Sequence, residues 1–289
     1  GMCCRPSAYD HESVRRTVLW YLLQGGRHID TADLYLNHQP IGKAIREAMD
    51  KGIPRSEIFV TTKIFPRHYG KESGTKMVQK FLNELGLEYI DLVLMHQPST
   101  FPLLHSDCKV QKLSQEKCRR ETWRSLSEAR DLGLVRDVGV SNFNVAQLSE
   151  LHDAIEEYSI SAPIAANQIP YNPWIAKRQM DIYQYCQTHG ITVVAYFPLG
   201  GAFQRKTTNM DDSDDVESSS SSSQQQHTTV LQNIAKSHNK TVAQVLLRWA
   251  IQKNVVVIPG TGNPTHMQHN LQVYSFELSK SDMAAIDYV

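Results

Sequence analysis

The stretch Ile58-Phe-Val-Thr-Thr-Lys-Ile64 is a short apolar, β-branched run, and a second run, Ile90-Asp-Leu-Val-Leu-Met-His96, follows it. Between the two runs, apolar residues recur at helical spacing over residues 75–85. A strand, a helix and a second strand in this order form a βα unit, and parallel strands covered on both faces are almost continuously apolar. This segment therefore predicts a parallel sheet with helices packed against it.

The same alternation continues through the chain in both directions. It predicts further strands at residues 28–32, 135–140, 165–169, 192–196 and 255–259. It predicts helices at residues 11–24, 41–51, 75–85, 119–132, 145–158, 178–189, 229–237 and 242–252, and two more that begin at Pro264 and Lys280.

Seven clear strands leave a closed barrel of eight strands one short. We expect the first strand at residues 2–6, as a short or truncated element. A doubly wound sheet is the alternative, but that fold would carry a GxGxxG turn after its first strand, and none follows residues 28–32. The sequence therefore predicts an α/β fold of the (β/α)8 TIM-barrel class, as a single domain over residues 2–289.

Residues 206–228 do not follow this alternation. They contain Asp211-Asp-Ser-Asp-Asp215, a serine run at 218–223 and three glutamines. Such a composition buries little apolar area, so we expect a mobile, low-complexity surface insertion. It follows the strand at 192–196, which would place it on the catalytic rim of the barrel.

Composition limits the class of partner. The 30 Lys and Arg residues balance 30 Asp and Glu residues, so no overall basic charge would attract nucleic acid. No run approaches the roughly 20 apolar residues that span a bilayer. The five cysteines form no Cys-x-x-Cys pair, and an odd number favours reduced thiols. We expect a cytoplasmic protein that binds a small molecule, without a metal, a membrane or nucleic acid.

Four polar residues lie at or just after the carboxyl ends of predicted strands, where barrel enzymes place their active sites. These are Asp30, Tyr35, Lys63 and His96. Each has a structural explanation when taken alone, such as a turn cap, a rim aromatic, a solvated lysine or a hydrogen-bonded core histidine. A lysine that ends an apolar strand is costly unless it is paired, however, and Asp30 on the neighbouring strand is the expected partner.

This group of residues suits the reduction of a carbonyl. Hydride delivery to the carbonyl carbon leaves negative charge on the oxygen, which must be stabilised and protonated. Tyr35 can donate that proton, and a nearby Lys63 ammonium would make the phenol a better acid. Asp30 would keep Lys63 charged and oriented, and His96 would hold the carbonyl oxygen by a hydrogen bond.

The chain resembles the aldo-keto reductases. The motifs that carry the resemblance occur in the order of that family: His28-Ile-Asp-Thr-Ala-Asp-Leu-Tyr35, Thr61-Thr-Lys63, Asp91-Leu-Val-Leu-Met-His96, Gly139-Val-Ser-Asn-Phe143, Asn167-Gln168, Ala195-Tyr-Phe-Pro-Leu-Gly200 and Ile258-Pro-Gly-Thr261. The resemblance implies a (β/α)8 barrel, a monomer, an NADP(H) cofactor, and Asp30, Tyr35, Lys63 and His96 as the catalytic group.

The resemblance also implies a set of cofactor-binding residues: Thr31, Ser141, Asn142, Gln168, Tyr196, Leu199, Gly200, Thr261, His266 and Asn270. Capping of the following helix is the alternative for Ser141 and Asn142, and a hydrogen-bonded buried amide is the alternative for Gln168. The loop from Pro259 to Pro264 leads into a helix, whose first N–H groups would suit a phosphate.

Three positions depart from the family pattern. Gly260 and His266 stand where many NADPH-preferring members have a lysine and an arginine, so NADH stays open as a cofactor. Gln97 stands where many members have a tryptophan that lines the substrate site.

The sequence predicts an NAD(P)H-dependent reductase of aldehydes or ketones; net alcohol oxidation with NAD is open. A non-catalytic cofactor-binding or redox-sensing partner protein is the alternative from another class.

Overall fold

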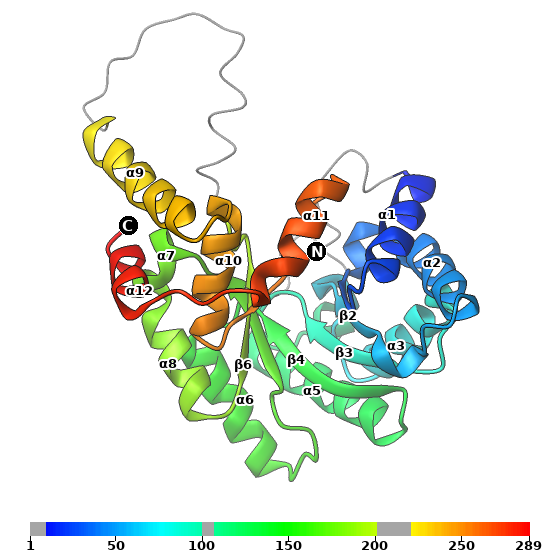
Figure 1. The fold of residues 1–289 in the computed structure, drawn as a ribbon. Helices are drawn as coiled ribbons and strands as arrows, with labels where there is room; N and C mark the ends of the chain where they lie inside the picture. The colour runs from blue at the N-terminus through cyan, green and yellow to red at the C-terminus, as the bar shows by residue number, and fades with distance from the viewer. Residues whose placement is uncertain (1–9, 100–106, 201–220) are drawn as a thin grey trace, which may run out of the picture. The chain divides into compact units, whose positions relative to one another are not determined.

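The computed structural model describes residues 10–99, 107–200 and 221–289 (Figure 1). The strand predicted at residues 2–6 and most of the low-complexity segment lie outside these residues. The chain divides into two compact units. One comprises Gly1–Ile169 and Ile182–Thr192, and the other comprises Pro170–Asp181 and Val193–Val289.

The first unit is built on a parallel sheet whose strands follow the order of the chain. The strands are β1 (His28–Asp30), β2 (Phe59–Ile64), β3 (Ile90–Met95), β4 (Val135–Ser141) and β5 (Ala166–Pro170). Every residue of β3 is buried, and β2 is buried from Val60 onward, which explains why both read as continuous apolar runs.

In the first unit, the helix at His11–Leu23 packs against that at His38–Asp50, which packs against that at Ser73–Leu85. The helix at Gln115–Asp131 contacts both Ser73–Leu85 and Val145–Glu157. The helices of this unit are α1 (His11–Leu23), α2 (His38–Asp50), α3 (Ser73–Leu85), α4 (Asp107–Val110), α5 (Gln115–Asp131), α6 (Val145–Glu157) and most of α8 (Met180–Thr188). Gly42 on α2 lies so close to the Leu85 carbonyl that a Cβ atom would collide with it. Glycine at this position therefore allows α2 and the end of α3 to approach closely.

Short 3-10 helices connect these elements. They are η2 (Asp33–Tyr35), η3 (Arg55–Glu57) and η4 (Pro66–His68) in the first unit, and η5 (Lys177–Gln179) and η7 (Gln272–Tyr274) in the second. The sequence pattern did not predict them, because three residues are too few to show a periodicity. Helix η2 carries Tyr35, one of the four residues predicted to be catalytic.

The second unit contains two parallel strands, β6 (Thr192–Tyr196) and β7 (Val256–Val257), of which β7 is shorter than predicted. Its helices are α7 (Pro173–Ala176), α9 (Ser221–Ser237), α10 (Val242–Gln252), α11 (Pro264–Leu271) and α12 (Lys280–Asp287). Trp249 of α10 is fully buried and stacks on Tyr171 at 5.5 Å between ring centroids. No helix in the described part of the chain is long and apolar enough to cross a membrane.

Helix α9 corrects one expectation about the low-complexity segment. The segment was expected to be a surface insertion through residue 228, but the structure begins α9 at Ser221. The last part of the serine run and the glutamines therefore extend the helix predicted at 229–237. Glutamine has a high helix propensity, which favours this extension although the segment has no apolar residues at helical spacing.

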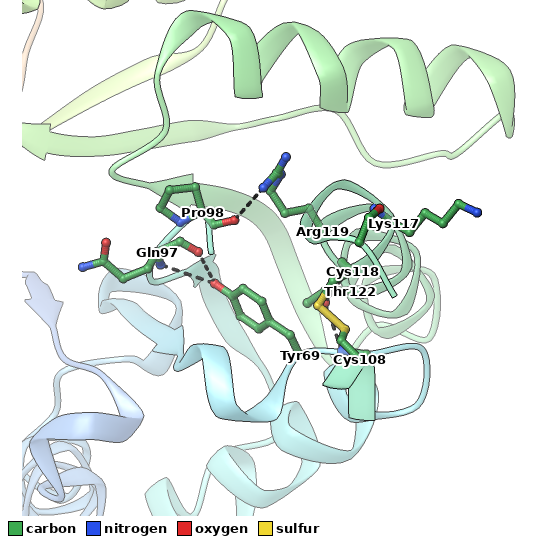
Figure 2. Close-up of a disulfide and its surroundings, with 10 residues drawn as sticks. Tyr69, Gln97, Pro98, Cys108, Lys117, Cys118, Arg119 and Thr122 are labelled. Carbon is green, nitrogen blue, oxygen red and sulfur yellow. Dashed lines mark hydrogen bonds between the residues drawn. A yellow bond between two sulfur atoms is a disulfide. The ribbon is translucent and has the colours of Figure 1, made fainter. Parts of the chain in front are cut away.

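A disulfide corrects the expectation that the cysteines are reduced. Cys108 of α4 and Cys118 of α5 are joined, with Cα atoms 5.5 Å apart, and both are buried (Figure 2). The prediction rested on an odd number of cysteines and on the missing Cys-x-x-Cys spacing, neither of which excludes a pair brought together by consecutive helices. Cys186 is buried and free.

Candidate active site

Asp30 and Lys63 form a buried ion pair in the first unit. Strands β1 and β2 pair with Asp30 opposite Thr61, so Lys63 lies two residues further along β2 on the same face. Its long side chain reaches back to Asp30, and Nζ lies 2.9 Å from each carboxylate oxygen. Lys63 is fully buried and Asp30 is buried as well. The ion pair predicted from the sequence is therefore present.

The attraction between Asp30 and Lys63 counteracts the effect of burial on the pKa of each group. Burial acts to raise the pKa of Asp30, but the Lys63 charge and hydrogen bonds from Lys63 and Gln168 outweigh it and hold that pKa below its usual value. Burial lowers the pKa of Lys63, and the Asp30 carboxylate counteracts this effect. Each charge thus depends on the other for its stability in the core.

Tyr35 and His96 lie beside this ion pair. Lys63 Nζ is 5.1 Å from the centroid of the Tyr35 ring, and the Tyr35 and His96 rings meet edge to face at 5.9 Å between centroids. Phe65, which follows β2, packs edge to face against His96 from another direction at 6.1 Å. The structure therefore brings together all four residues that the sequence analysis selected as catalytic.

His96 is in a state suited to donate a hydrogen bond as a neutral ring. Burial, together with the Lys63 charge, lowers the pKa of His96 to about 4. Its Nδ1 atom is buried and has no hydrogen-bond partner among the described residues. A neutral imidazole carries one N–H donor and one acceptor nitrogen, so it can bind a carbonyl oxygen without adding a charge to the site.

Polar groups at the ends of β4 and β5 extend this site. Gln168 Nε2 donates to Asp30 Oδ2 at 2.8 Å, and the Gln168 backbone carbonyl accepts from Ser141 Oγ at 2.9 Å. Asn142 Nδ2 donates to the His96 carbonyl and to Ser141 Oγ, each at 3.0 Å. A continuous hydrogen-bond network therefore runs from the ion pair to the backbone of His96.

Sequence reasoning missed two features of this arrangement. The bond between Gln168 and Asp30 joins residues far apart in the chain, and no local pattern indicates it. Asp33 was not selected at all, although its side chain is buried and paired with Arg67 at 3.2 Å and with Lys80 at 3.1 Å. An aspartate two residues before Tyr35 was the only available signal for it.

Comparison with known proteins identifies this arrangement. A model of the Aldo/keto reductase family matches residues 5–289. The chain belongs to the Aldo/keto reductase family. It is 34% identical to aldo-keto reductase AKR2E4 of Bombyx mori over 277 residues, which are 96% of this chain and 82% of that protein. It is also 34% identical to aldose reductase B of Dictyostelium discoideum over 278 residues, which are 92% of this chain and 80% of that protein.

The crystal structure of Bombyx mori AKR2E4 in complex with NADP matches this aldo/keto reductase with a TM-score of 0.78 and 33% identity, over 96% of this chain and 83% of that one. The predicted (β/α)8 TIM-barrel fold is thereby confirmed, and the doubly wound alternative is wrong. The protein is an NADP(H)-dependent oxidoreductase that reduces carbonyl groups, and the non-catalytic alternative is not favoured.

In the first unit of this aldo/keto reductase, the predicted cofactor-binding residues divide into two groups. Thr31, Ser141 and Gln168 are buried, and their side chains form hydrogen bonds within the protein; the Thr31 hydroxyl donates to Asn37 at 2.5 Å. Asn142 is half-buried, with its backbone in the left-handed region at a φ of 64°. Asn142 is thus more accessible than the buried three, whose side chains are bonded within the protein.

The second unit of this aldo/keto reductase holds the remaining predicted cofactor residues. Tyr196 ends β6 and is half-buried, and burial raises its pKa, so the phenol is neutral and its ring can stack on a nicotinamide. Leu199 and Gly200 lie in the turn after β6, where Gly200 has a φ of 60° and faces the Trp174 ring. Any side chain at Gly200 would collide with that ring.

Thr261 lies in the loop before α11, and His266 and Asn270 lie on the helix. His266 is exposed, and Thr261 and Asn270 are half-buried. The Asn263 side chain caps α11 by accepting from the backbone of Thr265 at 2.9 Å and of His266 at 3.4 Å. Two N–H groups at the start of the helix, where the sequence analysis expected a phosphate to bind, thus donate to the Asn263 side chain in this structure.

Proposed function

We propose that this aldo/keto reductase reduces an aldehyde or ketone with Tyr35 as the proton donor. The NADP(H) cofactor supplies the hydride when it is bound. The observation that carries the proposal is the location of Tyr35 beside both the buried Lys63–Asp30 ion pair and the neutral His96. This grouping places a proton donor, a positive charge and a neutral hydrogen-bond donor around one position.

Each of the other three residues has a distinct role in this proposal. Lys63 places a positive charge next to the Tyr35 ring, which stabilises the phenolate left after the proton has been given. Asp30 keeps that ammonium charged and fixed in place. His96 donates a hydrogen bond to the carbonyl oxygen and so orients it toward Tyr35.

The proposed cofactor contacts follow from the exposure of the candidate residues. In the first unit, Asn142 is the residue proposed to hold a nicotinamide carboxamide, with Ser141 and Gln168 orienting the atoms around it. In the second unit, Tyr196 offers a ring on which a nicotinamide can stack. Leu199 and Gly200 shape the turn that the cofactor passes. Thr261, His266 and Asn270 bind the phosphate end, where His266 takes the place of a stronger cationic group. Thr31 supports this arrangement through Asn37 and through its carbonyl, which accepts from Lys63 at 2.8 Å.

Steady-state kinetics tests the proposal directly. Consumption of NADPH, and separately of NADH, is measured with a reactive aromatic aldehyde for the wild type and for Tyr35→Phe. We expect Tyr35→Phe to lose activity by a factor of at least about 10² while it still binds NADPH, because the proton donor alone is removed. Activity that survives in Tyr35→Phe would contradict the assignment of Tyr35. Binding of NADPH without turnover in the wild type would favour the partner-protein alternative.

The physical state of the protein is also part of the proposal. We propose a single-domain monomer, on the basis of the continuous order of βα units. We also propose a cytoplasmic location, as in the sequence analysis, although the Cys108–Cys118 disulfide is a bond that a reducing compartment disfavours. Light scattering after size exclusion tests the monomer, and one cooperative unfolding transition by two optical probes tests the single domain.

A further inference from the structure

Tyr35 sits in a very short element that cannot hold itself in place. Helix η2 has three residues, in which Tyr35 N donates to the Ala32 carbonyl at 3.0 Å and the following Leu36 N donates to the Asp33 carbonyl at 3.3 Å. Leu36 then turns the chain with a φ of 52°. The position of the phenol therefore depends on side chains that anchor the segment before and after it.

Asp33 is the anchor before Tyr35. Its buried carboxylate contacts Lys80 Nζ of α3 at 3.1 Å and Arg67 Nη2 of η4 at 3.2 Å, with His68 Nε2 at 3.4 Å. Burial acts to raise the pKa of Asp33, but the hydrogen bonds and charges of His68 and Lys80 outweigh it and hold that pKa below its usual value. A charged carboxylate thus ties η2 to two other elements.

His38 is the anchor after Tyr35. It is buried, and its Nδ1 atom donates to Glu84 Oε2 of α3 at 2.8 Å, since a carboxylate can only accept. Its Nε2 atom lies 2.8 Å from the Thr62 hydroxyl, on the residue that precedes Lys63. The hydrogen bond from His38 also helps to hold the pKa of Glu84 below its usual value, so Glu84 is a charged acceptor.

The two anchors end on the same helix, one turn apart. Lys80 and Glu84 of α3 are themselves paired, with Nζ 3.5 Å from Oε1. A connected path therefore runs from Asp33 through Lys80 and Glu84 to His38, and it encloses the segment that contains Tyr35. Lys80 and Glu84 are partly exposed on α3, and nothing in the proposed chemistry uses them.

We propose that Lys80 and Glu84 are positioning residues for the reaction, because they hold the segment between Asp33 and His38 at both ends and so fix the Tyr35 phenol against Lys63 and His96. The inference rests on the proposed function, in which Tyr35 gives the proton. Neither residue touches the reacting atoms. They act by keeping the distance from the phenol to the carbonyl short, and proton transfer is sensitive to displacements of about 1 Å.

The competing explanation is that Lys80 and Glu84 only stabilise the fold. The solvent exposure of their side chains helps to distinguish this structural role from the positioning role. The Lys80 side chain is 46% exposed and that of Glu84 is 30% exposed. Ion pairs with such exposure contribute little to global stability. Lys80→Met and Glu84→Gln are therefore expected to fold like the wild type, so that a change in activity reports on the position of Tyr35.

The test compares Lys80→Met, Glu84→Gln and Asp33→Asn with a matched control on the same helix. The control is Gln79→Ala, which removes an exposed hydrogen bond to Asn83 within α3. For each variant, kcat and KM for an aromatic aldehyde, the solvent deuterium isotope effect on kcat/KM, the Kd for NADPH and the thermal midpoint are measured. The isotope effect is decisive. Partial unfolding lowers the fraction of active protein and therefore the measured kcat, but it leaves the isotope effect of the remaining active protein unchanged.

We expect kcat to fall on the order of tenfold in Glu84→Gln and Lys80→Met, with a larger isotope effect and an unchanged Kd for NADPH. The double variant Asp33→Asn/Glu84→Gln should lose less than the product of the two single losses, because both act on one segment. Gln79→Ala should behave like the wild type. If Asp33→Asn does not fold, the two α3 variants still decide the question.

Three outcomes overturn the inference: wild-type kcat in both α3 variants, a loss no larger than that of Gln79→Ala, or a loss with an unchanged isotope effect. Tyr35→Phe distinguishes this failure from failure of the proposed function. If Tyr35→Phe is inactive while Glu84→Gln and Lys80→Met retain full activity, only the positioning role is wrong. If Tyr35→Phe is active, the assignment of Tyr35 itself is wrong.

Discussion

Lys63 donates to both carboxylate oxygens of Asp30, each at 2.9 Å from Nζ. The third donor of the ammonium goes to the backbone carbonyl of Thr31 at 2.8 Å. A lysine has three N–H donors, so all of them are used by these acceptors. The charge is therefore fixed 5.1 Å from the centroid of the Tyr35 ring.

Substitution of Lys63 by Met should damage both stability and activity. The Asp30 carboxylate would stay in the core without its partner, which typically costs about 3–5 kcal/mol of the free energy of unfolding. Loss of the positive charge beside Tyr35 should lower kcat/KM by about 10²-fold or more. Urea denaturation and steady-state kinetics measure the two effects separately.

The double variant Asp30→Asn/Lys63→Met is the control for this experiment. It removes the unpaired charge, so we expect it to regain part of the lost stability and none of the activity. Equal stability of Lys63→Met and the wild type would show that the pair is not buried as described. Recovery of activity in the double variant would show that the Lys63 charge is not required.

Two histidines make the stability of the protein depend on pH. Burial lowers the pKa of His28 to about 4, and burial with the Lys63 charge lowers that of His96 to about 4. In the unfolded chain both should titrate near the ordinary value of about 6.5. Between about pH 6.5 and about 4 the unfolded chain binds more protons than the folded protein does. The contribution of the two neutral histidines to the free energy of unfolding should therefore be greatest above about pH 6.5 and decrease as the pH falls toward about 4.

His28→Gln tests this prediction, because its amide can keep a hydrogen bond to the Thr61 hydroxyl, which lies 3.0 Å from His28 Nε2. The free energy of unfolding by urea is measured from pH 7.5 down to pH 5 for both proteins. We expect a shallower decrease in His28→Gln, since one titrating group is gone. If the free energy of unfolding depends on pH in the same way in both proteins, the pKa of His28 is not lowered in the folded state.

The sequence predicted the regular part of the fold well, for a physical reason. Strands such as β2 and β3 are buried on both faces, and burial leaves a continuous apolar run that can be recognised without the structure. The four catalytic candidates were selected because each lies at or just after the end of such a run. Their pairing across neighbouring strands follows from the parallel order, which the alternation of strands and helices also predicts.

Contacts between distant segments could not be predicted in the same way. The bond from Gln168 to Asp30 and the path from Asp33 to His38 through α3 depend on side-chain directions that one sequence does not encode locally. The start of α9 at Ser221 was missed because a serine and glutamine run lacks the apolar periodicity that marks a helix.

The disulfide should stabilise the protein by restricting the unfolded chain. Cys108 and Cys118 are separated by 10 residues, and closing a loop of this length contributes about 3 kcal/mol to the free energy of unfolding. Cys108→Ser/Cys118→Ser should lose about that amount in urea denaturation. The start of α5 should loosen most, where Arg119 donates to the Pro98 carbonyl at 3.0 Å (Figure 2).

A reducing agent supplies the control for the disulfide. Reduction should bring the wild type to the stability of the double serine variant and leave that variant unchanged. A peptide map of protein purified without reductant should contain the linked Cys108 and Cys118 peptides. Unlinked peptides in that map would contradict the disulfide.

Replacement of His266 by Arg should increase the preference for NADPH over NADH. His266 is exposed on α11, where a permanent charge and a fork of donors would bind the 2′-phosphate better than an imidazole. We expect KM for NADPH to fall severalfold while KM for NADH hardly changes. Gln268→Arg adds the same charge to another exposed position of α11 and controls for long-range attraction. An equal gain in both variants, or an equal gain for both cofactors in His266→Arg, would show that His266 does not face the phosphate.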